Sequence, residues 1–209
     1  LGREYIVNNF PIPSGTLDDK DVFVKEVVIN EKVPVKKLKQ VQKKAKNIIL
    51  FIGDGMSVSQ ISAFRLFQGG PNSRVAVDSF PYSGQVLTHS ANAIVTDSAS
   101  SGTAYSTGEK TNNRALGVDI NGQPIENITE TLDRSGYVSS VISTSEVTHA
   151  TPAAFVVHTS SRYLTDEISI QMTDSKIKNI LGGGRKFFIP EEDGGNREDG
   201  INLIEKVKS

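Results

Sequence analysis

The sequence predicts an α/β fold of three layers, α/β/α, in which helices cover both faces of a mostly parallel central sheet. Strand-like and helix-like segments alternate from residue 47 onward, which is typical of such a sheet. The run NIILFIG is apolar throughout, as expected of a strand buried on both faces. The chain of 209 residues is 37% hydrophobic, which is enough for one sizeable core.

The first predicted elements are a strand at residues 47–53 and a helix at residues 57–70. The helix has Val58, Ile61 and Phe67 at helical spacing and two glycines at its end. The remaining elements are predicted, in chain order, as a strand at 83–89, a helix from Ser98, a helix at 128–136, a strand at 137–144, a helix over 151–161, a helix end or strand at 177–188 and a helix at 199–209.

The chain divides into two parts. Residues 1–46 contain the basic run KKLKQVQKKAK, which is typical of a solvated helix, and we expect an N-terminal extension there. Residues 47–209 are expected to form the N-terminal part of the α/β domain. A crossover helix in such a sheet normally leads to another strand, and here little sequence follows the last helix. We therefore expect the domain to be incomplete at its C-terminus.

Composition restricts the classes of function. The formal net charge of −1 gives no electrostatic reason for binding nucleic acid or an anionic membrane. The absence of cysteine excludes disulfides, thiolate zinc sites and a cysteine nucleophile. No apolar run approaches the ~20 residues of a membrane span, and LGREYIVNNF lacks the apolar core of a signal peptide. Asn127-Ile128-Thr129 matches the N-glycosylation sequon, a tripeptide that is common by chance.

Asp54 follows the first predicted strand and lies between two glycines. Ligands of open parallel sheets bind beyond the carboxyl ends of the strands, and glycine neighbours let a ligand approach closely. A carboxylate in this place suits Mg²⁺ or Zn²⁺. The alternative is that Asp54 caps the helix that begins near Met56.

Asp97 and Ser98 stand at the start of a helix made almost entirely of small residues. The unpaired N–H groups and positive dipole of a helix N-terminus favour an anion such as phosphate. Histidine, the usual activator of a serine, is scarce, and we expect His89 and His158 to be structural; a metal ion can stabilise the alkoxide instead. Either the helix packs tightly against another backbone or a ligand approaches its end. A capped helix start without chemistry is the alternative.

A third group of polar residues lies further along the chain. His149 and Thr151 are two residues apart on what reads as a short extended piece before a proline, so both side chains can face one metal-bound water. The planar guanidinium of Arg162 suits two phosphate oxygens. The alternative is that His149 is an ordinary loop residue and Arg162 a surface cation.

Four segments resemble the alkaline phosphatase family. They are, in chain order, NIILFIGDGMSVSQISAFR, VTDSASSGTAYSTG, THATPAAFVVHTSSR and ILGGGRKFFIP, and the resemblance covers residues 47–209. The motif VTDSASSGT around Ser98 is highly specific for that family. The resemblance implies an alkaline-phosphatase-like fold, a homodimer to whose contact residues 1–46 can contribute, and a secreted, periplasmic or cell-surface location.

The resemblance also implies a reaction and its cofactors. The reaction is the hydrolysis of small phosphomonoesters to inorganic phosphate, with two zinc ions and magnesium in each active site. Ser98 would be the nucleophile that forms a phosphoserine intermediate, and also a zinc ligand. Asp54 would bridge zinc and magnesium. Thr151 would bind magnesium, with His149 in its outer shell.

In the same family, a residue at the position of Arg162 holds the phosphoryl oxygens, and one at the position of Asp97 orients it. This sequence departs at Ser57, where many relatives have glycine. Most zinc ligands of the family lie in a second half that the 209 residues do not include, so we expect the chain alone not to be active. A non-catalytic phosphate- or metal-binding fragment, a degenerate homologue and a phosphodiesterase or sulfatase-like enzyme are the alternatives.

Overall fold

The computed structural model describes residues 45–208, of which those from Ile52 onward form one compact unit. The predicted extension at residues 1–46 therefore lies almost entirely outside the described residues. Across residues 45–208, no helix combines the length and the apolar character that a membrane crossing requires.

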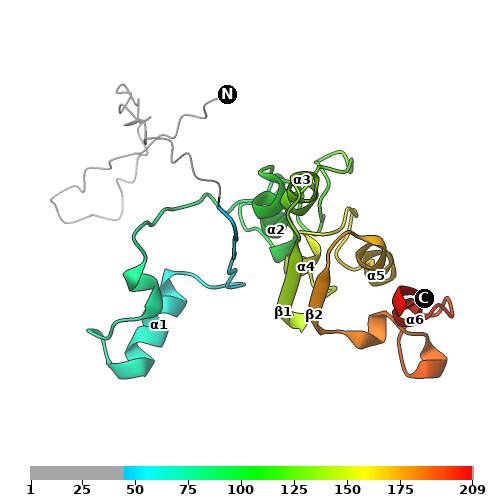
Figure 1. The fold of residues 1–209 in the computed structure, drawn as a ribbon. Coiled ribbons are helices and arrows are strands. Elements are labelled where there is room, and N and C mark those ends of the chain that lie inside the picture. The colour runs from blue at the N-terminus through cyan, green and yellow to red at the C-terminus, as the bar shows by residue number, and fades with distance from the viewer. Residues whose placement is uncertain (1–44, 209) are drawn as a thin grey trace, which may run out of the picture. The chain divides into compact units, whose positions relative to one another are not determined.

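Short helices and a pair of strands make up this part of the chain (Figure 1). The α-helices are α1 (Val58–Gly69), α2 (Ser98–Thr107), α3 (Ile128–Arg134), α4 (Ala150–Ala153), α5 (Thr165–Asp174) and α6 (Leu203–Lys208). The strands are β1 (Ser140–Glu146) and β2 (Asn179–Gly183), and 3₁₀ turns cover Ala76–Ser79, Arg185–Phe187 and Glu191–Asp193.

The two strands pair in parallel, with Ser140 opposite Asn179 and Val141 opposite Ile180. The strand predicted at 137–144 is thereby confirmed. Between the two strands the chain runs through α4 and α5, as a parallel connection requires. The region predicted as a helix end or strand forms β2, and its closing glycines lead into a 3₁₀ turn.

The mostly parallel central sheet predicted from the sequence is reduced to this one pair of strands within residues 45–208. Residues 47–53 and 83–89, both predicted as strands, have no strand conformation. A strand is held by hydrogen bonds to its neighbours, and a buried parallel strand needs cover on both faces. Phe51 is 89% exposed and Leu87 is 79% exposed. Among the described residues, these two apolar runs therefore have neither a paired strand nor cover on their faces.

The predicted helices at 57–70, from Ser98, at 128–136 and at 199–209 are confirmed as α1, α2, α3 and α6. The helix predicted over 151–161 starts earlier and is much shorter, because α4 ends after one turn. Helix α5 is absent from the predicted elements. Its signals are Ile168 and Met172, four residues apart and both buried, behind Asp166 and Glu167 in the first turn.

The small residues of α2 allow it to pack closely against α4, which in turn contacts β1 (Figure 1). Ala99 of α2 is fully buried, as are Ala153 and Ala154 at the end of α4. A Cβ atom on Gly102 would lie 2.9 Å from the Cβ of Ala154 and 3.7 Å from the Cα of Thr151. The lack of bulk therefore permits two backbones to approach each other, the first of the two explanations offered above.

Asn127, the first residue of the sequon, caps α3. Its Oδ1 accepts hydrogen bonds from the backbone N–H groups of Thr129 and Glu130, over 2.9 and 3.2 Å. The Glu130 carboxylate accepts in return from the Asn127 N–H over 2.9 Å, which completes a capping box. Asn127 is fully buried, and its Nδ2 has no hydrogen-bond partner among the described residues.

Candidate active site

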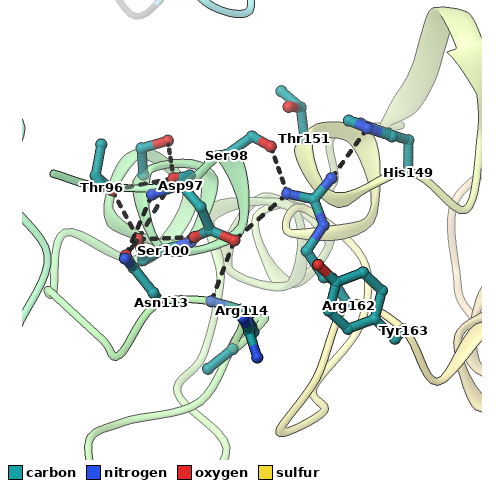
Figure 2. A network of polar contacts seen from close by, with 12 residues as sticks. Thr96, Asp97, Ser98, Ser100, Asn113, Arg114, His149, Thr151, Arg162 and Tyr163 are labelled. Carbon is teal, nitrogen blue, oxygen red and sulfur yellow. Dashed lines mark hydrogen bonds and ion pairs between the residues drawn. The ribbon is translucent and has the colours of Figure 1, made fainter. Parts of the chain in front are cut away.

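Ser98 is the first residue of α2, and its hydroxyl lies against the guanidinium of Arg162 (Figure 2). Nη1 of Arg162 donates a hydrogen bond to Ser98 Oγ over 2.7 Å. Asp97 is the N-cap of the helix, because its Oδ1 accepts from the Ser100 N–H over 3.0 Å. Asp97 therefore caps the helix, as the alternative interpretation expected. The hydrogen bond from Arg162 to Ser98 is a further contact that capping does not require.

Arg162 connects three residues of the candidate site. Besides Ser98, its Nη1 donates to Asp97 Oδ2 over 3.4 Å, and its Nη2 lies 3.0 Å from His149 Nε2. An arginine has only donors, so His149 Nε2 is the acceptor of this hydrogen bond. The Arg162 side chain is only 17% exposed, which limits the positions that its guanidinium can take.

Asp97 is surrounded by hydrogen-bond donors. Its Oδ1 also accepts from Ser100 Oγ over 3.1 Å, and its Oδ2 accepts from the Arg114 N–H over 3.2 Å. Burial alone would raise the pKa of Asp97, but the donors from Ser100, Arg114 and Arg162 outweigh it and lower that pKa below its ordinary value. The carboxylate therefore stays charged beside Arg162.

Asp54 and Thr151 form a second contact. Thr151 Oγ1 donates a hydrogen bond to Asp54 Oδ2 over 2.9 Å, although the two residues are 97 positions apart. The alternative role of Asp54 as a helix cap does not hold, because Ser57 caps α1 and accepts from the Ser59 N–H over 3.2 Å. The Asp54 carboxylate is exposed.

The expected extended piece that carries both His149 and Thr151 is not present. His149 has an extended backbone and stands at the N-cap position of α4, whereas Thr151 lies within the helix itself. Thr151 is helical because the turn that contains it packs its alanines against α2. This tertiary contact cannot be seen in the local pattern before the proline. The two side chains nevertheless both lie near Ser98 and Arg162 (Figure 2).

The residues described do not form a complete metal site. Within 45–208 there is no group of three or more histidine, cysteine, aspartate or glutamate side chains placed to hold one ion. A catalytic zinc site needs three protein ligands. Asp54 and Thr151 supply two adjacent oxygen atoms, which match part of the ligand set of a hard cation such as Mg²⁺.

Three residues of this network were not predicted from the sequence: Ser100, Asn113 and Arg114. Ser100 lies in the serine motif, and its spacing three residues after Asp97 is a signal for the capping bond. Asn113 Oδ1 accepts from the Asp97 N–H over 3.2 Å and from Ser100 Oγ over 3.0 Å. For Asn113 and Arg114 the local sequence KTNNR gives no signal, because their contacts join segments distant along the chain.

The sequence model of the family "Alkaline phosphatase" matches residues 45–209. Alkaline phosphatase 4 of Bacillus subtilis is 36% identical over 195 residues, which cover 88% of this chain and 40% of that protein. The tissue-nonspecific isozyme of Gallus gallus is 34% identical over 207 residues, which cover 78% of this chain and 40% of that protein. The chain thus spans about 40% of the length of these curated relatives.

Solved structures agree with this match. Alkaline phosphatase from the Antarctic bacterium TAB5 superimposes with a TM-score of 0.68 at 35% identity, over 74% of this chain and 43% of that chain. A variant of the TAB5 enzyme, in which a histidine is replaced by glutamate and Mg is bound in the M3 site, gives a TM-score of 0.67 at 35% identity, over 74% and 42% of the two chains. The family model and the solved structures thus agree on a family of hydrolases. This chain belongs to the alkaline phosphatase family.

Proposed function

We propose that this chain supplies the nucleophile and the phosphate-binding arginine of a metal-dependent phosphomonoesterase. The observation that carries the proposal is the 2.7 Å hydrogen bond between Arg162 and Ser98 Oγ, made by a guanidinium that Asp97 and His149 also hold. A hydroxyl beside a fixed guanidinium at a helix N-terminus is suited to a phosphoryl group.

In the proposed reaction Ser98 Oγ forms a bond to phosphorus while the bond from phosphorus to the leaving alcohol breaks. Water then cleaves the resulting phosphoserine and releases inorganic phosphate. The two outer nitrogens of Arg162 hold phosphoryl oxygens, and the charged Asp97 keeps that guanidinium in place. Zinc and magnesium, when bound, supply positive charge that stabilises the serine alkoxide and the phosphoryl oxygens.

Asp54 and Thr151 are proposed as a partial ligand set, Asp54 for zinc and magnesium and Thr151 for magnesium. His149 is proposed in the outer shell of magnesium and Ser98 as a zinc ligand. The remaining ligands are proposed to come from the part of the relatives that this chain does not span. The substrates are proposed to be small phosphomonoesters, hydrolysed by a homodimer outside the cytoplasm.

The test uses the complete gene product that contains this chain, supplied with Zn²⁺ and Mg²⁺ and assayed on a generic aryl phosphate at alkaline pH. Ser98→Ala is expected to abolish both turnover and the phosphoenzyme trapped by acid quench, because no oxygen remains to bond phosphorus. Ser101→Ala is the matched control on the same helix, since Ser101 Oγ donates only to the Asp97 backbone C=O, over 2.8 Å. A phosphoenzyme in the Ser98→Ala protein would contradict the assignment.

Arg162→Ala separates phosphate binding from bond formation. Loss of the guanidinium is expected to raise the KM for aryl phosphate and the inhibition constant for inorganic phosphate by about tenfold to a hundredfold, with a phosphoenzyme still formed. Steady-state kinetics with phosphate as a competitive inhibitor measures both quantities. An unchanged phosphate inhibition constant would remove Arg162 from the proposed role.

A second candidate function is binding of phosphate or a metal ion without turnover. It is favoured by the Arg162 guanidinium, which His149 and Asp97 hold beside Ser98 and which suits phosphate whether or not bond cleavage follows. Calorimetric binding of inorganic phosphate by a protein that releases no phosphate from the aryl ester would establish this second function and exclude the first.

A further inference from the structure

Arg114 has the only positive φ angle outside glycine in the stretch 45–208, at 77°. A side chain with a Cβ atom is disfavoured in this left-handed region, and a non-glycine residue there is uncommon. Such strain persists only where the surrounding structure imposes it, and it clusters at functional sites. The contacts of the Arg114 backbone therefore need an explanation.

The strained backbone serves two residues of the candidate site at once. Its N–H donates to Asp97 Oδ2 over 3.2 Å, and its C=O accepts from the Arg162 N–H over 2.7 Å. Asp97 and Arg162 are 65 positions apart in the sequence and belong to separate segments. One residue thus joins, through its two backbone groups, the segment of the N-cap carboxylate to the segment of the guanidinium.

The neighbours of Arg114 anchor the same connection. Asn113 Oδ1 accepts from the Asp97 N–H, next to the start of α2. Further on, Leu116 and Thr159 exchange backbone hydrogen bonds of 2.9 and 2.8 Å. The segment that contains Arg114 is therefore held to α2 at one end and to the segment before Arg162 at the other, which leaves its φ angle little freedom.

We infer that Arg114 is a positioning residue, whose left-handed backbone sets Asp97 and Arg162 at their mutual distance and so holds Arg162 for phosphate. The inference rests on the proposed function, because it takes phosphate as the ligand of Arg162. The Arg114 guanidinium has a different contact, 5.8 Å from the ring centroid of Tyr163, and both of these side chains are exposed. The backbone conformation, and not the side-chain charge, carries the role.

The test compares substitutions that keep or disfavour the left-handed conformation in the complete gene product with its metals. Arg114→Gly accepts a positive φ without strain and is expected to keep the phosphate inhibition constant and the KM within about twofold of the wild type. Arg114→Val disfavours that conformation strongly, because valine is β-branched. It is expected to raise both constants about tenfold or more.

A double substitution distinguishes positioning from general damage. In an Arg162→Ala background, Arg114→Val is expected to cause no further rise of the phosphate inhibition constant, because the residue through which it acts is gone. The same fold-change in both backgrounds would overturn the inference. If the valine protein does not fold, Arg114→Ala takes its place. A phosphate inhibition constant of the alanine protein within about twofold of the wild type supports the backbone role. Rises of about tenfold in both the alanine and the glycine proteins would assign the effect to the guanidinium and overturn the inference.

The wild-type protein separates this inference from the proposed function. A wild type without phosphomonoesterase activity refutes the proposed function, and the inference with it. The inference alone is refuted by a different result. In that case the wild type is active and Arg162→Ala raises its phosphate inhibition constant, but Arg114→Val has the same KM and the same phosphate inhibition constant as the wild type.

Discussion

Four donors point at the Asp97 carboxylate: the Ser100 N–H, the Ser100 hydroxyl, the Arg114 N–H and Nη1 of Arg162. A carboxylate is the one side chain that can accept from all of them at once without a proton of its own. The same residue therefore starts α2, holds the proposed phosphate-binding arginine and takes part in the connection through Arg114.

The lowered pKa of Asp97 makes part of the folding stability depend on pH. A carboxyl group whose pKa is lower in the folded protein contributes stability at pH values above its unfolded pKa, and this contribution is lost as the pH falls through the folded value. Wild type is therefore expected to unfold at a higher temperature than Asp97→Asn at about pH 7, with a gap that shrinks toward about pH 3. Thermal unfolding of both proteins at the two pH values is the measurement.

Ser101→Ala serves as the control for that comparison, because the Ser101 hydroxyl bonds the Asp97 backbone and not its carboxylate. Its difference from wild type is expected to stay constant with pH. A gap between Asp97→Asn and wild type that is equally large at acidic and neutral pH would show that the carboxylate charge does not contribute.

At the scale of the elements, the contact between α2 and α4 determines how close their backbones lie. Gly102 and Ala154 leave no space there for another methyl group. Helix propensity alone would favour Gly102→Ala by about 1 kcal/mol. The added Cβ would lie 2.9 Å from the Cβ of Ala154. We therefore expect overpacking to cost about 1–3 kcal/mol, so that Gly102→Ala lowers the free energy of unfolding instead of raising it.

Chemical denaturation of the Gly102→Ala protein measures this change in the free energy of unfolding. Ala154→Gly in the same protein is the matched control, because it removes the opposing methyl group and is expected to recover part of the loss. A Gly102→Ala protein more stable than wild type would mean that the two helices can separate without cost.

The starts of three helices could be predicted from local signals, whereas the predicted strands at 47–53 and 83–89 do not form among the described residues. Ser57, Asp97 and Asn127 cap their helices, and capping depends on residues within one turn. The first strand prediction depended on the apolar residues of 47–53 alone, yet a strand also needs a hydrogen-bonding neighbour far along the chain. Local sequence cannot supply that neighbour, and the described residues do not supply it either.

The candidate site was predictable as a set of residue types but not as a set of contacts. Ser98, Asp97 and Arg162 carry the chemistry that a phosphoryl group needs, and the structure places them together. The bond from Arg162 to His149 and the backbone link through Arg114 depend on the fold of distant segments. No pattern within a short window encodes such contacts.

At the scale of the whole molecule, much of the apolar surface of residues 45–208 is open to solvent. Ile49 is 78% exposed, Phe67 is 88% exposed and Ile94 is 91% exposed. Exposed apolar surface of this kind marks an interaction surface or a tendency to aggregate. The chain also spans only about 40% of its curated relatives.

The 209-residue chain produced alone is therefore expected to bind a hydrophobic dye and to self-associate in size-exclusion chromatography. The complete gene product is the comparison, with dye fluorescence per mole expected to be several-fold lower, because burial of apolar surface removes the binding sites. Equal dye binding by the two proteins would show that the exposed runs stay open in the longer protein as well.

Asn127 ends up in an unusual position for the first residue of a sequon. Its amide nitrogen, the atom to which an oligosaccharide would be joined, is enclosed within the folded chain while the oxygen holds the start of α3. A transferase could therefore reach that nitrogen only before this part of the chain has folded. A sugar on that nitrogen would prevent the Asn127 side chain from being buried as it is here, although its oxygen could still accept from the start of α3.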